Sequence, residues 1–234
     1  MVEAYLNGKR TYAVQSKEDL LAFIKNKKAI LIAMNTEKIL REDIRLREIV
    51  NSNIGYPDGV GAVLAMRRKG IPARKIPGAV FWLEIVKAFH LGKTFYLLGS
   101  KSDIINMTVI KLKKEYPGIK ILGYRDGYFT DAEYVEIKQD IQQRKPDVIF
   151  VALGSPRQEY VMADLIAVHP ALYMGLGGSF DLFCGKVKAV PDWWCRYFIW
   201  EGLYRALSDM GNIQRWKRQL PAMRIIYKIL LGRL

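Results

Sequence analysis

The stretch between Asp147 and Asp181 constrains the fold more strongly than any other part of the sequence. It contains an unbroken apolar run over residues 148–153, a predicted helix over 160–166 and a second apolar run over 171–174. Apolar runs of this length predict strands that are buried on both faces, which is typical of a parallel sheet covered by helices. The stretch therefore predicts an α/β fold.

Each of these two predicted strands ends in small residues. The first is followed by Gly154, Ser155 and Pro156, where Ser155 is suited to cap a helix and Pro156 to occupy its first position. The second is followed by Gly177 and Gly178. In such sheets ligands bind beyond the carboxyl ends of the strands, and free N–H groups at a helix start favour an anion. We therefore expect a site for a phosphorylated ligand, although the glycines would serve equally well in two tight turns.

The alternation of strands and helices extends over most of the chain. Further predicted strands over 29–34, 94–98 and 119–124 alternate with predicted helices, and no repeat or low-complexity segment interrupts them. An Asn7-Gly8 pair predicts a small β-hairpin near the amino terminus. We therefore predict a doubly wound, mostly parallel, Rossmann-like domain over residues 1–195.

Residues 196–234 have a different pattern of apolar and charged residues from the rest of the chain. Apolar residues recur there at spacings of three and four, with basic residues between them. The pattern predicts a basic amphipathic helical appendage, which either associates with an anionic membrane surface or packs on the body of the protein. The apolar positions are Ile213, Trp216, Leu220, Met223, Tyr227 and Leu230.

The composition limits the classes of partner and of binding site that we expect. The formal net charge of +14 indicates an anionic partner, which leaves nucleic acid, a membrane surface and a phosphorylated substrate open. Two cysteines without a Cys-x-x-Cys pair, and two histidines far apart in the sequence, give no support to a disulfide framework or a zinc site. We expect neither a membrane-spanning helix nor a signal peptide.

Several motifs of other enzyme classes are missing. There is no Gly-x-Gly-x-x-Gly after the first strand, no Walker-type Gly-Lys-Ser/Thr and no Asp-x-Asp pair at a strand end. This disfavours a nicotinamide enzyme, a P-loop ATPase and a metal-bound nucleotide-sugar site. The remaining features fit transfer from a nucleotide-activated donor at a membrane. A nucleic-acid-binding module and a soluble nucleotide-dependent oxidoreductase on the same fold remain alternatives.

Six short motifs occur one after another along the chain. They are Asn35-Thr36-Glu37-Lys38, Tyr56-Pro57-Asp58-Gly59, Asp126-Gly127-Tyr128-Phe129, Gly154-Ser155-Pro156-Arg157-Gln158-Glu159, Gly177-Gly178-Ser179-Phe180-Asp181 and Glu201-Gly202-Leu203-Tyr204-Arg205. In this order they resemble the WecG/TagA/CpsF family, glycosyltransferase family 26, over about residues 30–224. The match is closer to the branch that uses UDP-N-acetylmannosaminuronate, notably around residues 35–38 and 168–170.

The resemblance implies a bacterial, inverting, metal-independent enzyme with no cofactor beyond its UDP-sugar substrate. It implies Asp58 as the general base, Gln158 as a substrate-site residue, and Arg205 and Arg215 as cations that reach the donor diphosphate. We expect the donor to be bound at the strand ends, by Asn35, Gly99, Ser100, Gly154, Ser155, Arg157, Glu159, Gly177, Gly178 and Asp181.

The resemblance also implies the reaction partners. The donor sugar would be N-acetylmannosaminuronic acid or N-acetylmannosamine, with a UDP-hexose as the alternative, and the acceptor an undecaprenyl-diphosphate-linked amino sugar. The enzyme would work as a peripheral protein on the cytoplasmic face of the inner membrane, without a nucleic-acid partner and with a homo-oligomer left open. Ala33, Ala189 and Asn212 stand where some members carry Thr, Arg and Arg, and these departures leave the exact donor undecided.

Overall fold

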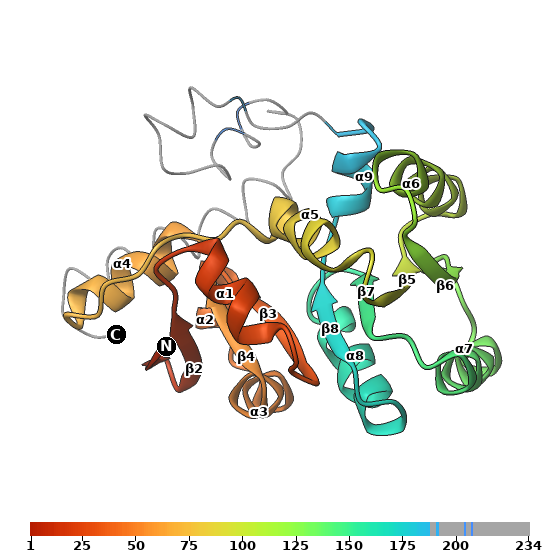
Figure 1. Ribbon diagram of the computed structural model, residues 1–234. Helices are drawn as coiled ribbons and strands as arrows, with labels where there is room; N and C mark the ends of the chain where they lie inside the picture. The colour runs from red at the N-terminus through yellow and green to blue at the C-terminus, as the bar shows by residue number, and fades with distance from the viewer. Residues whose placement is uncertain (188–190, 192–203, 205–206, 208–234) are drawn as a thin grey trace.

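Strands and helices alternate along the chain (Figure 1). The computed structural model describes residues 1–187 together with 191, 204 and 207. Its strands are β1 (Val2–Leu6), β2 (Lys9–Ala13), β3 (Ala29–Met34), β4 (Ile54–Pro57), β5 (Thr94–Gly99), β6 (Lys120–Arg125), β7 (Val148–Ala152) and β8 (Leu172–Gly175). Its helices are α1 (Lys17–Ile24), α2 (Thr36–Leu40), α3 (Ile44–Ser52), α4 (Val60–Arg68), α5 (Gly78–Phe89), α6 (Ser102–Glu115), α7 (Asp131–Arg144), α8 (Arg157–Val168) and α9 (Ser179–Phe183).

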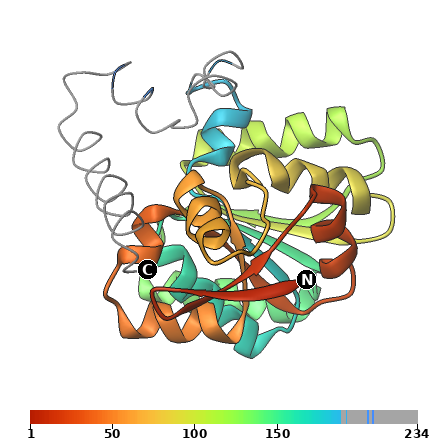
Figure 2. The ribbon, with the colours of Figure 1, turned by 90° about the vertical axis from the view of Figure 1, so that its left-hand side faces the viewer.

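The main sheet has six strands in the order β4-β3-β8-β7-β5-β6, and every neighbouring pair is parallel. Alternate residues of β3, β5, β7 and β8 enter two separate cores. In β3, for example, Ile30 and Ile32 belong to the core that includes residues of α3, α7 and α8, whereas Leu31 belongs to the core that includes residues of α1, α5 and α6. Figure 2 shows the strands between the two helix layers. The predicted doubly wound parallel sheet is confirmed.

The connections after β5 and β7 leave the sheet on opposite faces. β5 continues into α6 and returns as β6, whereas its neighbour β7 continues into α8 and returns as β8 on the other side. Neighbouring strands whose connections diverge in this way mark the point where open α/β sheets bind ligands. The fold therefore directs attention to the carboxyl ends of β5, β7 and β8.

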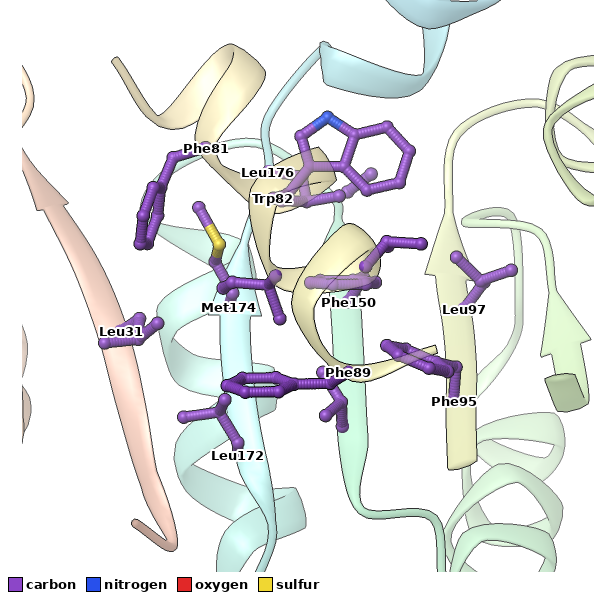
Figure 3. Packing of buried hydrophobic residues seen from close by; sticks show 14 of the residues in the cluster. Leu31, Phe81, Trp82, Phe89, Phe95, Leu97, Phe150, Leu172, Met174 and Leu176 are labelled. Atoms are coloured by element: carbon purple, nitrogen blue, oxygen red, sulfur yellow. The ribbon is translucent and has the colours of Figure 1, made fainter. Parts of the chain in front are cut away.

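Helix α5 carries the aromatic centre of one core (Figure 3). The Trp82 side chain is fully buried and meets the rings of Phe150, Phe180 and Phe183 edge-on, at centroid distances of 5.5, 5.6 and 5.2 Å. Phe150 lies in β7, and the other two lie in α9. Trp82 therefore fixes the short helix that follows β8 against the sheet and α5, since aromatic pairs prefer this edge-on geometry.

The predicted hairpin is present, and Asn7 and Gly8 both have positive φ in its turn. It lies against β4, a strand that the sequence analysis did not predict. A Cβ at Gly55 would come within 2.6 Å of the Arg10 carbonyl oxygen, so glycine allows the hairpin to cross this strand. Pro57 is tolerated because β4 is an edge strand that pairs only with β3. Because glycine and proline are uncommon in strands, the sequence pattern did not predict β4.

Two other segments differ from expectation. The charged sequence before residue 50, which predicts one helix, is divided into α2 and α3, because Asp43 caps a new helix by accepting a hydrogen bond from the Leu46 N–H. The residues after Gly178 form the short helix α9 rather than a simple turn. The predicted appendage over 196–234 lies outside the described residues except at positions 204 and 207.

Candidate active site

The motif residues gather at the carboxyl edge, by which we mean the residues that directly follow the carboxyl ends of the parallel strands. The strand pairing brings these ends level: Pro57 pairs with Met34, Ala152 pairs with Gly99, and Gly175 pairs with Val151. The chain segments that begin at Asn35, Asp58, Ser100, Leu153 and Leu176 consequently start side by side.

Asp58 lies at the first position after β4 and is half-buried. Its Oδ1 accepts a hydrogen bond of 2.6 Å from the Gly78 N–H, at the first residue of α5. A Cβ at Gly78 would lie 2.6 Å from the Tyr56 hydroxyl and 3.3 Å from Asp58 Oδ1, so these groups enclose the glycine. We call Tyr56, Asp58 and Gly78 the Asp58 corner. The Gly78 N–H thereby orients the Asp58 carboxylate at the start of α5.

The Tyr56 hydroxyl is an unusual member of this corner, because it is buried and has no hydrogen-bond partner among the described residues. Burial first, and the negative charge of Asp58 second, raise the pKa of Tyr56 well above its ordinary value. The hydroxyl is therefore neutral at physiological pH and remains a potential donor next to the Asp58 carboxylate.

A second set of polar groups lies at the ends of β3, β7 and β8. The Lys38 ammonium is 2.7 Å from Glu159 Oε1, and the same oxygen accepts a hydrogen bond of 3.1 Å from Gln158 Nε2. Gln158 Oε1 in turn accepts a hydrogen bond of 2.9 Å from the Gly177 N–H. We call Lys38, Gln158, Glu159 and Gly177 the Lys38 network. Lys38, Gln158 and Glu159 are each at most 4 % exposed.

Glu159 is ionised in this network. Burial acts to raise the pKa of its carboxyl, but the charge and hydrogen bond of Lys38, together with Gln158 and Ser155, outweigh burial and lower that pKa from its ordinary value. Glu159 is fully buried, and its side chain contacts Lys38 and Gln158.

Asn35 connects the Lys38 network to the Asp58 corner. Its Oδ1 accepts a hydrogen bond of 3.0 Å from the Lys38 N–H and thereby caps α2. Its Cα lies 3.4 Å from the position that a Cβ would take at Gly59, the residue after Asp58. Asn35 therefore has a local structural role at the carboxyl edge, in addition to its predicted role in donor binding.

The ends of β5 and β7 are in direct backbone contact. Gly99 has a φ of +120°, and a Cβ there would come within 2.3 Å of the Ala152 carbonyl oxygen, so this position requires glycine. The Ser100 N–H donates to the same oxygen at 2.9 Å, and the Ser100 hydroxyl donates to Asp181 Oδ2 at 3.2 Å. Of the predicted donor-binding residues, the structure thus brings Gly99, Ser100 and Asp181 together.

Helix α8 begins one residue later than predicted. Pro156 is its N-cap, because the Pro156 carbonyl accepts the first helical hydrogen bond from the Tyr160 N–H, and Ser155 does not cap the helix. The Gln158 N–H bonds to the Gly154 carbonyl and the Glu159 N–H to the Pro156 carbonyl. These two amides are therefore engaged within the protein, which weakens the argument for an anion site at this particular helix start.

Arg157 remains at the exposed side of α8. Its guanidinium lies 4.9 Å above the Phe129 ring centroid and donates to the Gly127 carbonyl at 3.2 Å. Gly127 fits against Gly99 and Leu153, where a Cβ would come within 3.2 Å of Gly99 Cα and 2.7 Å of Leu153 Cδ2. The aspartate–glycine motif after β6 thus supports the positions of Arg157 and the β5 end.

Sequence reasoning missed Tyr56 and Gly78 as members of the site. Tyr56 was quoted only as part of a motif, and Gly78 was not singled out. Neither has a sequence signal that would identify it, because their proximity to Asp58 depends on α5 beginning beside the end of β4. Lys38 belonged to a motif, but nothing in the sequence paired it with Glu159.

Other predictions lie outside the described residues. Arg205 and Arg215 fall in that part of the chain, as do Asn212 and Ala189. Among the described residues no group of three or more His, Cys, Asp or Glu side chains is arranged to hold a metal ion. Within the same residues, no helix is long and apolar enough to cross a membrane.

The comparison with protein families agrees with this arrangement. Residues 9–234 match the glycosyl transferase WecG/TagA/CpsF family, which covers nearly the whole chain. Members of this family are glycosyltransferases of cell-envelope polysaccharide synthesis. A match of this extent includes every motif at the carboxyl edge and supports a transferase over an oxidoreductase or a nucleic-acid-binding module. The chain belongs to the WecG/TagA/CpsF family and is a glycosyltransferase.

Proposed function

We propose that this glycosyltransferase moves N-acetylmannosaminuronic acid or N-acetylmannosamine from a UDP donor to an undecaprenyl-diphosphate-linked amino sugar. The observation that carries the proposal is the Asp58 carboxylate, which is oriented by the Gly78 N–H at the carboxyl edge of a doubly wound sheet. A half-buried carboxylate in this place is suited to accept a proton from an acceptor hydroxyl. A UDP-hexose remains the alternative donor.

The reaction would proceed by in-line displacement with inversion. The acceptor oxygen forms a bond to the anomeric carbon of the donor, and its proton passes to the Asp58 carboxylate. The bond between the anomeric carbon and the UDP oxygen breaks, and the electron pair leaves with UDP. Cations are needed where negative charge develops on the diphosphate, and Arg205 and Arg215 are the residues that we propose for this role.

The acceptor's lipid chain would remain in the bilayer, so we propose that the protein works as a peripheral enzyme on the cytoplasmic face of the inner membrane. The basic, amphipathic sequence of residues 196–234 supports this location. Basic residues near an anionic surface each contribute about 1 kcal/mol to membrane binding.

The direct test is a transfer assay. The protein is incubated with a panel of UDP-sugars and a short-chain lipid-diphosphate-linked N-acetylglucosamine, and the glycosylated lipid is detected by mass. We expect product with UDP-N-acetylmannosaminuronate or UDP-N-acetylmannosamine, in excess chelator as well as without it. Product from a UDP-hexose alone would replace the donor assignment, and activity restored only by added magnesium or manganese would refute metal independence.

A separate variant tests the proposed role of Arg215 in stabilising the donor diphosphate. Arg215→Ala should lower turnover while binding to anionic vesicles is retained, because one charge among the eight basic residues after position 195 is removed. Unchanged turnover with a water-soluble acceptor would show that the diphosphate is stabilised elsewhere, and Arg157 would then be the residue to examine.

A further inference from the structure

The Lys38 network is buried beneath the carboxyl edge, and the proposed mechanism assigns no step to its two charged members. Lys38 is 4 % exposed, Glu159 is fully buried and Gln158 is 3 % exposed. Charged side chains are rarely buried to this extent unless they are paired. The burial of two charged residues beneath the carboxyl edge therefore requires an explanation.

The hydrogen bonds of the network fix the orientation of the Gln158 amide. An ionised carboxylate can only accept hydrogen bonds, so Glu159 Oε1 requires the NH₂ group of Gln158 on its side. The Gly177 N–H can only donate, so it requires the amide oxygen on the other side. If the amide were flipped, its NH₂ group would face the Gly177 N–H and its oxygen would face the Glu159 carboxylate. Neither contact would be a hydrogen bond, so only one of the two orientations is satisfied.

The same contacts join three neighbouring strand ends. Lys38 follows β3 and also donates to the Ala33 carbonyl in that strand at 3.1 Å. Gln158 opens α8 after β7, and Gly177 follows β8. The amide lies directly on β8, since a Cβ at Gly175 would come within 2.5 Å of Gln158 Nε2. Any displacement of Glu159 would therefore be transmitted to Gln158 and to the turn at Gly177.

Stability alone does not explain this choice of residues. A buried ion pair contributes little more than an apolar pair of similar volume would, because desolvation of the two charges offsets their attraction. An apolar pair, however, could not present an acceptor to the Gln158 amide. What the charged pair adds is a directed hydrogen bond at the edge of the site.

We propose that Lys38 and Glu159 are positioning residues for sugar transfer, which act by holding the Gln158 amide and the Gly177 turn in one arrangement. Lys38 keeps Glu159 ionised in a buried place, and Glu159 then dictates which end of the amide faces Gly177. The inference rests on the proposed function, because it takes the carboxyl edge as the place where donor and acceptor meet.

Two double variants separate orientation from charge and packing. Lys38→Met/Glu159→Gln and Lys38→Met/Glu159→Leu both remove the ion pair and keep similar volumes. Only the first retains an oxygen that can accept from the Gln158 NH₂ group. We expect kcat/KM for the Leu variant to fall about tenfold to a hundredfold below that of the Gln variant, because misplaced substrate-contacting groups have effects of this order. Melting temperatures of both variants are measured in parallel.

Equal activity in the two folded variants would overturn the proposal, since the acceptor at position 159 would then be irrelevant. A second measurement does not depend on the variants folding. In the wild-type protein, the NH₂ protons of a Gln158 side chain held by Glu159 should exchange slowly with solvent, and the hydrogen-bonded proton should be shifted from the value of a free amide. Fast exchange with solvent together with free-amide shifts would contradict the inference.

The assays also distinguish this inference from the proposed function. Absence of transfer by the wild-type protein with every UDP-sugar would count against the function, while the NMR measurement would still report on the amide. Normal wild-type transfer combined with a mobile Gln158 amide would count against the positioning role alone.

Discussion

The Asp58 corner and the Lys38 network lie at neighbouring strand ends but differ in burial and in hydrogen bonding. In the network, two charges and one amide are almost fully buried and bonded to one another, although Glu159 Oε2 has no hydrogen-bond partner among the described residues. In the Asp58 corner, the carboxylate is half-buried, and the adjacent Tyr56 hydroxyl has no hydrogen-bond partner in the same part of the chain. Buried charges that are joined to each other resist rearrangement, whereas a partly accessible carboxylate can accept a proton from a substrate. The comparison supports our proposal that the network positions the site and that Asp58 reacts.

The strongest test of this division is Asp58→Asn. If Asp58 is the general base, the variant should retain its fold and UDP binding but lose transfer by about a hundredfold to ten-thousandfold. The initial rate of lipid glycosylation measures the effect, and thermal melting controls for folding. Unchanged turnover would show that Asp58 is only a turn residue that orients Gly78.

The second test breaks the network instead. Lys38→Met leaves the Glu159 carboxylate buried without its cation and should destabilise the protein by about 3–5 kcal/mol at neutral pH. The folded-state pKa of Glu159 is lowered in the wild type, so the pair's contribution is complete above the unfolded pKa of about 4.3 and is lost as pH falls through the folded pKa.

The difference between wild type and Lys38→Met should consequently shrink on acidification. Denaturant titrations at pH 7 and below pH 4 measure it. A stability difference that is independent of pH would mean that Glu159 does not change its ionisation with Lys38, and the electrostatic account of the network would be wrong.

A third test compares steric fit within the Asp58 corner. Gly78→Ala would place a Cβ 2.6 Å from the Tyr56 hydroxyl oxygen, and overpacking of this kind destabilises by about 1–3 kcal/mol. The matched double variant Gly78→Ala/Tyr56→Phe removes that oxygen and should recover most of the lost stability. A double-mutant cycle in denaturant gives the coupling. No recovery would place the conflict at Asp58 Oδ1, 3.3 Å from the same position.

The smallest expected effect is that of Tyr56→Phe alone. The hydroxyl is buried without a partner, so its removal should leave stability unchanged or raise it by about 1 kcal/mol. A loss of more than about 1 kcal/mol would show that the hydroxyl has a partner in solution, and the contrast between the corner and the network would weaken.

Part of the site could be predicted because its signals are local. Small residues after an apolar run mark a strand end, which is why Gly99, Gly154 and Gly177 were recognised. The start of α8 was misjudged by one residue, because the hydrogen-bond pattern that sets a helix start depends on backbone conformation. Strand β4 was missed since an edge strand tolerates a proline that would be excluded from the interior.

The sequence by itself determined the alternation of strands and helices, the parallel sheet and the family, because periodicity and short motifs depend on residues that are close in the chain. Only the tertiary structure decided which motif residues meet. Lys38 pairs with Glu159 across 121 positions, and Gly78 orients Asp58 from 20 positions away. These contacts depend on the strand order β4-β3-β8-β7, which sets which strand ends are neighbours and which no local pattern encodes.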